Sequence, residues 1–525
     1  MKNFNKFHDS RENGELLSKI TGKQLDIEKV ITETELLFHQ CRKNKSVPPF
    51  NKSPITVPFS KKIIERLVRL FAKPYNILEP SQIYVDSKGN VYPEWKPKLD
   101  DEYENLMSRI TREVNIEDYG GIGDGKTDNT AAFKKAIGNG FVKVNVPEGI
   151  FITKRIVLPS WTYLVGAGKG KTTIKLHDIA PKGARLITNA NHWKGNHHLI
   201  VQGMTLDWNV ERLGDVKKTS TWGNHSSCLT YANVNYGWVK DVEAINPGLH
   251  CFDISSTLYN YAGDGFGAKG GSRYVWLDNL TGYGFGDDGV TTHHSDYILI
   301  SDSHMCDPSG RAHQEGASNS NGFEIDDGSR NVLLVNNSSA RCFGGIEIKA
   351  HQNSSAASNI QIVGHISVND NRAYNFRHIG HHKSTDTESK SAYNIAAINL
   401  AAIKPIFTGL YKDSTPRGVV VSAYKNVVIN HFTLIGDPDY DYRGNPVIAV
   451  QYQARNVVLN NISIKEFKRA SANIKIYGGE NRADSVSINN VEVFASASKA
   501  IDIGKDVEDI HVQQVNILEK ASYHL

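Results

Sequence analysis

Short aliphatic strands recur along most of this chain, with turn residues and no helical pattern between them. Near the C-terminal end, strands that start at Val427, Val457, Val486 and Ile510 follow one another after 30, 29 and 24 residues. A single repeat of this length cannot bury its apolar face, so successive repeats have to stack. The pattern therefore predicts an all-β fold, a parallel β-helix. Earlier strands of the same kind start near Ile200, Val239, Val275, Ile298, Val332 and Ile360, and the step of 67 residues to Val427 leaves room for two turns.

Asparagine marks the ends of many of these strands. Asn426 and Asn456 precede strands, whereas Asn336 and Asn461 follow them. Asparagine tolerates turn conformations, and its side-chain amide can hydrogen-bond to an identical residue stacked above it. We therefore expect columns of asparagine at the turns of the solenoid.

The first 113 residues differ from the rest. Residues 15–43 have helical periodicity that is broken at Gly22, and residues 61–73 form a second amphipathic pattern with a basic face. Residues 74–97 contain four prolines and a hairpin signal, which is typical of a connector. The helices either pack on another surface of the protein or form an attachment module. We expect a helical N-terminal region over residues 1–113 and a β-helix domain over residues 114–525.

Composition excludes several classes of protein. The net charge is only +4 with 22% charged residues, so no nucleic-acid partner is expected. No stretch approaches 18 apolar residues, and residues 1–6 lack the apolar core of a signal peptide, so we expect neither a membrane span nor secretion by the ordinary route. The five cysteines are dispersed without a CxxC motif, which argues against a disulfide framework and against structural zinc.

Three glycine-led segments in the middle of the chain carry the chemistry: residues 286–294 (GDDGVTTHH), 322–327 (GFEIDD) and 345–349 (GIEIK). Strand side chains alternate between two faces, so the aliphatic residues point one way and the charged residues the other. If these three segments form neighbouring strands, their charged side chains gather on one exposed face. That face would then carry several acids, a histidine and a lysine. Such a composition is typical of a hydrolytic site.

Glycosidic hydrolysis needs one carboxylic acid as proton donor and one carboxylate as base or nucleophile. Crowded carboxylates separate one another's pKa values, which allows both forms near neutral pH. We predict catalytic roles for four acids on three adjacent turns: Asp288, Glu324, Asp326 and Glu347. The predicted substrate-binding residues are Asp287, His293, His294, Asp327 and Lys349.

Other interpretations of these residues stay open. Asp287 and Asp327 stand beside glycines and suit turns, and Glu347 with Lys349 suits a surface ion pair. A phosphodiesterase that uses His293 and the acids, with or without a divalent cation, is the close alternative to a glycosidase. No metal ligand set is assigned.

Several other motifs have simpler explanations. Residues 166–173 lack the spacer and the following helix of a phosphate loop, which favours a glycine-rich turn. The histidines of residues 378–383 lie in a polar insertion, which favours a loop beside the groove. The tryptophans of the early turns are either core residues or platforms for sugar rings: Trp208, Trp222, Trp238 and Trp276.

Two stretches carry a family resemblance. Residues 118–133 (DYGGIGDGKTDNTAAF), followed by 146–151 (VPEGIF), resemble the start of pectate-lyase-like right-handed β-helix proteins, a group that includes polygalacturonases and phage tailspikes. The resemblance covers residues 114–525 and implies a right-handed parallel β-helix. Residues 286–295 and 322–329 further resemble phage and prophage appendage proteins, among them pre-neck appendages that degrade teichoic acid.

The resemblance implies a phage tail or appendage spike that binds and depolymerises teichoic acid or capsular polysaccharide. It also implies a virion location, a homotrimer, and contacts to other virion tail proteins through the N-terminal region. Two other functions compete with this one. One is a receptor-binding or structural virion protein without catalysis, and the other is a pectate-type lyase with Lys349 as base. The acids Glu324 and Asp326 favour the enzyme, because adhesion to an anionic polymer would favour lysine and arginine.

The chain departs from the polygalacturonase pattern at two places. Asp287 and Asp288 match the paired aspartates of that family, but no Gly-His-Gly follows, and residues 322–326 stand in its place. The segment 347–349 has glutamate where the family has the arginine of Arg-Ile-Lys. Losing a histidine and an arginine disfavours galacturonan as the substrate.

Overall fold

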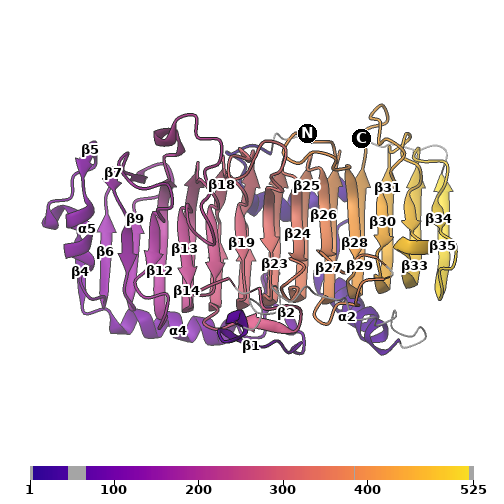
Figure 1. Cartoon of the computed structure of the whole chain (residues 1–525), viewed down its shortest axis with the longest axis horizontal. Helices are drawn as coiled ribbons and strands as arrows, with labels where there is room; N and C mark the ends of the chain where they lie inside the picture. Colours follow the sequence, from indigo (N-terminus) through magenta and orange to yellow (C-terminus); the bar gives the residue numbers. More distant parts are fainter. Residues whose placement is uncertain (1–3, 45–66, 260, 384, 519–525) are drawn as a thin grey trace.

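The computed structural model describes residues 4–44, 67–259, 261–383 and 385–518. The chain winds into a right-handed parallel β-helix whose turns follow one another along the long axis (Figure 1). Two parallel sheets, one of 19 strands and one of 12 strands, form its walls. The predicted all-β solenoid with a small helical N-terminal region is confirmed.

Successive turns of the solenoid contribute strands to both sheets. The 12-stranded sheet contains β8 (Ile156–Leu158), β11 (Ile187–Asn189), β13 (Leu229–Ala232), β15 (Phe252–Ser255), β19 (Val290–Thr292), β22 (Asn321–Ile325), β24 (Gly344–Ala350), β26 (Arg372–His378), β28 (Arg417–Ser422), β30 (Ile448–Gln451), β32 (Ile474–Ile476) and β34 (Ile501–Ile503). The 19-stranded sheet contains β4 (Arg112–Asn115), β5 (Asp124–Asp128), β6 (Val142–Val146), β7 (Gly149–Thr153), β9 (Thr162–Gly166), β10 (Thr172–Leu176), β12 (Asn196–Asp207), β14 (Val234–Ile245), β17 (Arg273–Asp278), β18 (Thr281–Tyr283), β20 (Asp296–Ser301), β21 (His304–Cys306), β23 (Arg330–Ala340), β25 (Ser358–Val368), β27 (Tyr393–Ile403), β29 (Lys425–Ile435), β31 (Arg455–Lys465), β33 (Asp484–Phe494) and β35 (Ile510–Leu518).

The predicted repeat corresponds to the 19-stranded sheet. Each predicted strand start lies in one of its strands, and β27 occupies the long step between Ile360 and Val427. The interior is filled by aliphatic and aromatic side chains from both sheets, which form one continuous core along the solenoid. Phe323, Ile325 and Ile346 belong to that core, as strand alternation predicts. Helix α5 (Thr130–Ile137) covers the end of the core that begins the solenoid (Figure 1).

The predicted asparagine columns are present. The side-chain amide of Asn394 donates to Asn359 at 2.8 Å, that of Asn426 to Asn394 at 2.9 Å, and that of Asn456 to Asn426 at 3.1 Å. All four residues have positive φ angles, between 53° and 69°. Asparagine adopts this left-handed conformation more readily than other residues with side chains, so it suits a sharp turn that repeats at every level.

The N-terminal region forms helices α1 (Asn13–Thr21) and α2 (Ile27–Lys43), separated at Gly22 as predicted. Residues 61–66 of the other predicted helix lie outside the described residues; Leu67–Arg69 are helical and lead into β1 (Ala72–Pro74). The predicted hairpin is β2 (Ile83–Val85) with β3 (Val91–Pro93). Helix α4 (Lys96–Arg109) was not predicted, because the prolines of residues 74–97 were assigned to a connector. A proline in the first helical turn is compatible with a helix, since no N–H is needed there.

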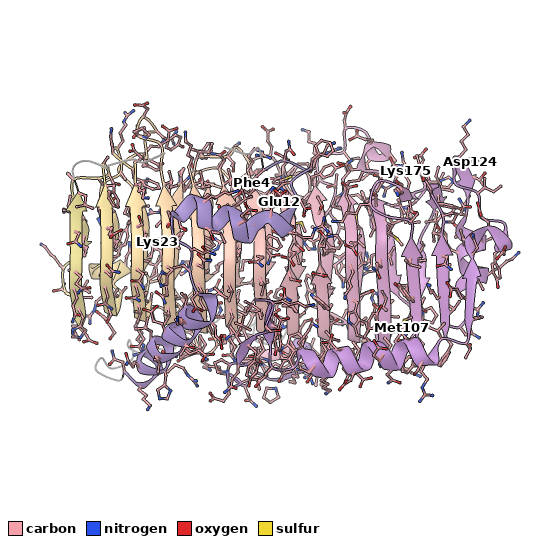
Figure 2. All side chains as sticks on the ribbon, turned by 180° about the vertical axis from the view of Figure 1, so that it is seen from behind. Phe4, Glu12, Lys23, Met107, Asp124 and Lys175 are labelled. Carbon is pink, nitrogen blue, oxygen red and sulfur yellow. The ribbon has the colours of Figure 1, made fainter. Side chains whose placement is uncertain are left out.

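These helices lie on the outside of the 19-stranded sheet (Figure 2). Helix α1 packs on β25 and β27, α2 on β29, and α4 on β12 and β14. Leu17, Ile31 and Leu99 are buried there, so the β-helix itself covers their apolar stripes. An attachment role for residues 1–113 stays a prediction.

All five cysteines of the chain are buried and unpaired. Within the described ranges, no helix is both long and apolar enough to cross a membrane.

Candidate active site

The three glycine-led segments lie side by side in the 12-stranded sheet. Strands β15, β19, β22, β24 and β26 are consecutive neighbours there. Thr291 is opposite Glu324, and Glu324 is opposite Glu347. The parallel register therefore aligns the outward-pointing acids of successive turns, as the sequence predicted.

The side-chain amide of Asn321 joins acids from three turns. Its Nδ2 atom lies 3.1 Å from Oδ1 of Asp288, 3.0 Å from Oε1 of Glu324 and 2.9 Å from Oε2 of Glu347. Asn321 is fully buried, and its backbone N–H also donates to Asp288 at 3.0 Å. The sequence analysis missed this residue. The available signal was its position directly before Gly322 at the start of a strand.

Lys349 lies among these acids. Its Nζ atom is 2.6 Å from Oε1 of Glu324 and 3.6 Å from Oδ2 of Asp326. The interpretation of Glu347 and Lys349 as a surface ion pair is wrong, because both side chains are buried. Glu347 instead accepts hydrogen bonds from Arg377 at 2.5 Å and from Asn375 at 2.6 Å, both on the next strand.

Histidines flank the second segment. His293 Nε2 lies 3.4 Å from Oδ2 of Asp326, and His351 Nδ1 lies 3.0 Å from Oδ2 of Asp327. His294 has a different environment: its backbone N–H donates to the Asp327 carbonyl at 2.7 Å, and burial lowers the pKa of its imidazole to about 4. His293 differs from His294, because burial lowers the pKa of its imidazole but Asp326 outweighs burial and holds that pKa above the ordinary value.

A second group of residues surrounds the Asp287–Asp288 pair. His250 Nδ1 is 3.0 Å from Oδ2 of Asp253, and its Nε2 is 3.4 Å from Oδ2 of Asp288. His313 Nε2 lies 3.0 Å from Oδ2 of Asp287. The sequence analysis missed His250, Asp253 and His313, since they come from an earlier turn and a long loop without a motif.

The electrostatics separate the acids into two classes. Burial raises the pKa of Asp288, and the nearby carboxyl groups of Glu324 and Asp287 raise it further. Burial also raises the pKa of Glu324, more than Lys349 lowers it. Asp326 is buried too, but Lys349 and His293 outweigh burial and hold its pKa well below the ordinary value. Arg377 and Lys349 lower the pKa of Glu347 in the same way. The pKa values of neighbouring carboxyl groups are therefore shifted in opposite directions.

The expectation that these acids lie on an exposed face is wrong. Only 1% of Asp288, 3% of Glu324 and 1% of Asp326 is exposed. Part of the shielding comes from residues 256–259 and 261–271, which we call the cover. The Tyr259 ring stacks on His293 with centroids 4.0 Å apart, and its hydroxyl donates to Asp253 at 3.1 Å. Tyr261 packs edge-on against His351 at 5.7 Å.

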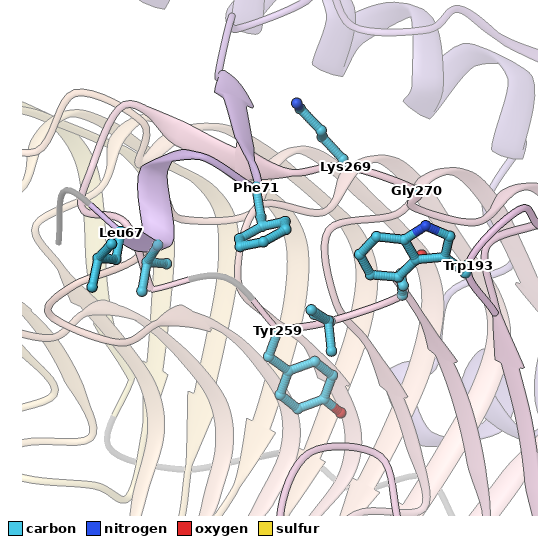
Figure 3. A pocket seen from close by; sticks show the side chains of 9 residues that line it. Leu67, Phe71, Trp193, Tyr259, Lys269 and Gly270 are labelled. Atoms are coloured by element: carbon cyan, nitrogen blue, oxygen red, sulfur yellow. The ribbon is translucent and has the colours of Figure 1, made fainter. Parts of the chain in front are cut away.

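Residues 67–75, which we call the strap, hold this cover. Strand β1 of the strap pairs antiparallel with β16 (Phe266–Ala268) of the cover. Tyr75 donates its backbone N–H to Gly265 at 3.0 Å, and its hydroxyl to the Ala356 carbonyl at 2.8 Å. A cavity of about 460 Å³, lined by Phe71, Trp193 and Tyr259 among others, lies where strap and cover meet (Figure 3).

Four histidine-containing groups among the described residues bear on the question of a metal. Two of them share Asp326 in the acid cluster: His293 with Glu324 and Asp326, and His351 with Asp326 and Asp327.

Two further groups are centred on His250 and on His378. His250, Asp287 and Asp288 offer ligand atoms within 4.8 Å of one another, and Oδ2 of buried Asp288 has no hydrogen-bond partner among the described residues. Imidazole and carboxylate donors of this kind fit a divalent cation. At the other group, His378 contacts Ser389 and the Ser354 carbonyl through its two ring nitrogens, which fits the structural interpretation of residues 378–383.

Comparisons with known proteins place this arrangement in a family. Residues 113–347 match a family model described as rhamnogalacturonase A/epimerase, pectate lyase-like. The solved N-terminal fragment of gene product 12 of bacteriophage phi29 is 40% identical and superposes with a TM-score of 0.72, over 80% of this chain and 69% of the fragment. The chain belongs to the pectate-lyase-like β-helix family.

Curated members of this family resemble the chain over most of its length. A phage-related protein, YobO, of Bacillus subtilis strain 168 is 50% identical over 435 residues, which cover 83% of this chain and 54% of YobO. The pre-neck appendage protein of Bacillus phage phi29 is 43% identical over 407 residues, which cover 77% of this chain and 47% of that protein. The chain thus spans about half the length of these relatives.

The two departures from the family's polygalacturonase pattern are partly compensated in space. The strand of Glu347 lacks the expected arginine, but Arg377 on the adjacent strand brings a guanidinium to Glu347. No Gly-His-Gly is present, yet His250 and His293 lie within 3.4 Å of Asp288 and Asp326, respectively.

Proposed function

We propose that this chain is a phage appendage protein that hydrolyses an anionic polymer of the bacterial surface, either teichoic acid or capsular polysaccharide. One observation carries the proposal: the Asn321 amide joins Asp288, Glu324 and Glu347 within 3.1 Å. Lys349 joins Glu324 of this group to Asp326. The pKa values of the clustered acids are shifted in opposite directions, raised for Asp288 and lowered for Asp326. Opposite shifts in one cluster are what acid–base hydrolysis needs.

Each acid then has a role. Asp288, whose pKa is raised, donates a proton to the leaving oxygen as the bond to it breaks. Asp326, held as a carboxylate by Lys349 and His293, accepts a proton from the attacking water, whose oxygen forms the new bond. Glu324 links the two through Asn321 and Lys349. Glu347, hydrogen-bonded to Arg377 and Asn375, is a positioning residue.

The cations of the site support a phosphodiester as the second candidate bond. Asp253 and Asp287 outweigh burial and raise the pKa of His250 to about 9. Lys349 adds further positive charge beside the acids. Cationic donors of this kind stabilise a phosphate group during attack. If a cation binds His250, Asp287 and Asp288, it would supply charge stabilisation at the same place.

The same geometry disfavours the pectate-type lyase. A lyase would use Lys349 as a neutral base. Burial lowers the pKa of this ammonium, but Asp326 and Glu324 outweigh it and raise the pKa well above its ordinary value. A lysine that stays protonated cannot abstract a proton.

The relatives named as phage pre-neck appendage proteins support a virion location. We extend the proposal to a homotrimer and to contacts with other virion proteins through residues 1–113, as the family resemblance implies. Size-exclusion chromatography with light scattering tests the trimer, and binding of virion proteins to variants of the exposed α1 and α2 surfaces tests the contacts.

The decisive experiment incubates the protein with purified teichoic acid and capsule from Gram-positive cells. We expect soluble fragments from wild type and at least a ~100-fold lower rate from Glu324→Gln, Asp326→Asn and Asp288→Asn. The matched control is Glu480→Gln, at an exposed acid remote from the cluster along the solenoid. Thermal melts verify that each variant is folded.

Fragment end groups separate the two bond types, since phosphomonoester ends indicate a phosphodiesterase and reducing sugar ends a glycosidase. Polymer binding without any fragments from wild type would overturn the enzyme and leave a receptor-binding spike.

A further inference from the structure

The row of outward-pointing residues that contains the acids continues toward the start of the solenoid. Asp253 on β15 is opposite Thr230 on β13, and Thr230 is opposite Thr188 on β11. Beside these earlier turns lies a cavity of about 260 Å³, whose lining includes Trp193, Trp222 and Tyr259. The cavity therefore follows the same face as the candidate active site.

Two tryptophans flank this cavity with their rings largely in solvent. Trp193 is 66% exposed and Trp222 is 67% exposed, whereas Trp208 and Trp238 are buried in the cores. Large exposed indoles forgo the stabilisation of burial, and clustered ones are typical of binding surfaces. Of the tryptophans that the sequence analysis left open between core and sugar platform, Trp208 and Trp238 are core residues. Trp222 is exposed and available to a ligand.

Contacts within the loops hold the ring of Trp222 and the backbone of Trp193. Trp222 stacks on His225 with centroids 4.8 Å apart. The backbone of Trp193 donates to Asn191 Oδ1 at 3.1 Å and accepts from the Asn233 amide at 3.3 Å. Held aromatic rings lose little entropy when a flat ligand surface stacks on them.

The positively charged side chain of Arg185 also lines the cavity. The guanidinium of Arg185 donates to the side-chain oxygen and the carbonyl of Asn224, at 3.1 and 3.2 Å. Because Asn224 is neutral, it orients the guanidinium without cancelling its charge. Burial and the charge of Arg185 lower the pKa of His192 to about 4, so this histidine is a neutral hydrogen-bonding group near pH 7. The same two causes lower the pKa of His225.

We propose that Arg185, Trp193 and Trp222 form a binding subsite for one unit of an anionic glycopolymer. A sugar ring stacks on the indoles, and a phosphate or carboxylate group pairs with Arg185. The polymer class in this proposal rests on the proposed function. The subsite adds to that function a means of polymer recognition by residues outside the acid cluster.

Tyr259 connects the subsite to the acids. It lines the cavity, its ring stacks on His293, and its hydroxyl donates to Asp253. A polymer unit held between the tryptophans therefore lies next to the residue that covers the candidate active site. Binding there positions the following unit toward the acids, which lowers the entropic cost of reaction.

The test measures affinity by isothermal titration in the Asp326→Asn background, which keeps the polymer intact. Four ligands are compared: glycosylated poly(glycerol phosphate), the same polymer without sugar, a neutral glucan, and polygalacturonate. We expect Trp193→Ala and Trp222→Ala each to weaken binding of the glycosylated polymer about 5- to 100-fold. Arg185→Gln is expected to weaken anionic ligands at least ~10-fold and to leave the neutral glucan unchanged.

The matched controls are Phe7→Ala, an aromatic side chain that is 83% exposed, and Arg443→Gln, an exposed arginine. Stronger binding of the glycosylated polymer than of polygalacturonate identifies phosphate as the anion, and the reverse identifies carboxylate. Unchanged affinity in both tryptophan variants, or no binding of any ligand, overturns the subsite.

The outcomes for the two proposals are separable. Tryptophan-dependent binding without fragments from wild type supports the subsite and overturns hydrolysis. Fragment release with unchanged affinity in the tryptophan variants supports hydrolysis and overturns the subsite.

Discussion

The ammonium group of Lys349 lies 2.6 Å from a carboxylate oxygen of Glu324, and 6% or less of either side chain is exposed. The same ammonium is 3.6 Å from Asp326. It therefore helps to bury Glu324 and Asp326 together, and it stabilises the charged form of Asp326 on which the proposed chemistry depends.

Replacing Lys349 by methionine should destabilise the protein by about 3–5 kcal/mol, because buried acids would lose their counter-charge. Urea denaturation followed by circular dichroism measures this change. The double variant Lys349→Met/Glu324→Gln should recover part of the loss, since one of the unpaired charges is gone. A double variant no more stable than the single one would show that Lys349 acts by packing and not by charge.

Stability should fall between neutral and alkaline pH through His250. Its pKa is raised from 6.5 to about 9, because Asp253 and Asp287 outweigh the effect of burial. A group whose folded pKa is raised contributes its full stabilisation below the unfolded pKa and loses it as pH rises through the folded value. The loss between pH 6.5 and 9 should be on the order of 3 kcal/mol.

Urea denaturation at a series of pH values tests this dependence. His250→Gln should flatten the stability curve over that range, while His39→Gln, at an exposed position of α2, should leave it unchanged. Curves of equal slope for wild type and His250→Gln would contradict the assignment.

Gly289 is required for the close approach of two turns beside Asp288. A Cβ atom at this position would lie 2.6 Å from the Gly322 carbonyl oxygen and 2.7 Å from Cγ of Met305. Gly289→Ala should therefore cost about 1–3 kcal/mol and displace Asp288 from Asn321, with loss of polymer cleavage. Gly14→Ala is the control, since no atom lies within 4 Å of its Cβ. Wild-type thermal stability in Gly289→Ala would contradict this.

The strap should control the mobility of the cover. Tyr75→Phe removes hydrogen bonds of 2.8 Å to the Ala356 carbonyl and 2.7 Å to Ser358. At about 1 kcal/mol for each bond, amide exchange of Gly265–Ala268 should become at least ~5-fold faster, as hydrogen–deuterium exchange can measure. Tyr84→Phe, whose hydroxyl bonds only to nearby Gln82 among the described residues, is the control. Equal exchange in all three proteins would show that the strap does not restrain the cover.

The solenoid was predictable because its determinants are local and repeated. Aliphatic alternation sets the faces of β22 and β24, and the left-handed asparagines mark the turns. The same alternation places Glu324 and Glu347 on the outer face of neighbouring strands, so the acids of the site followed from the repeat.

The rest of the site depends on contacts without a period. His250 and His313 reach the Asp287–Asp288 pair from an earlier turn and a long loop, and no spacing in the sequence encodes that meeting. The cover is an irregular insertion held by the distant strap. Strand alternation distinguishes the inner from the outer face, but it cannot show that loops close over the outer face. The acids were therefore predicted on the correct face with the wrong exposure.

The pairing of β1 with β16 joins segments almost two hundred positions apart in the chain. This ladder can form only after the intervening turns have wound and the segment before the solenoid has returned to them, and closure over such a distance is entropically costly. We therefore expect the shielding of the acids by the cover and the strap to be completed late in folding. A chain with a folded solenoid but an undocked strap would expose these acids to water. Formation of the buried site therefore depends on the strap, although the strap contributes no acid to the site.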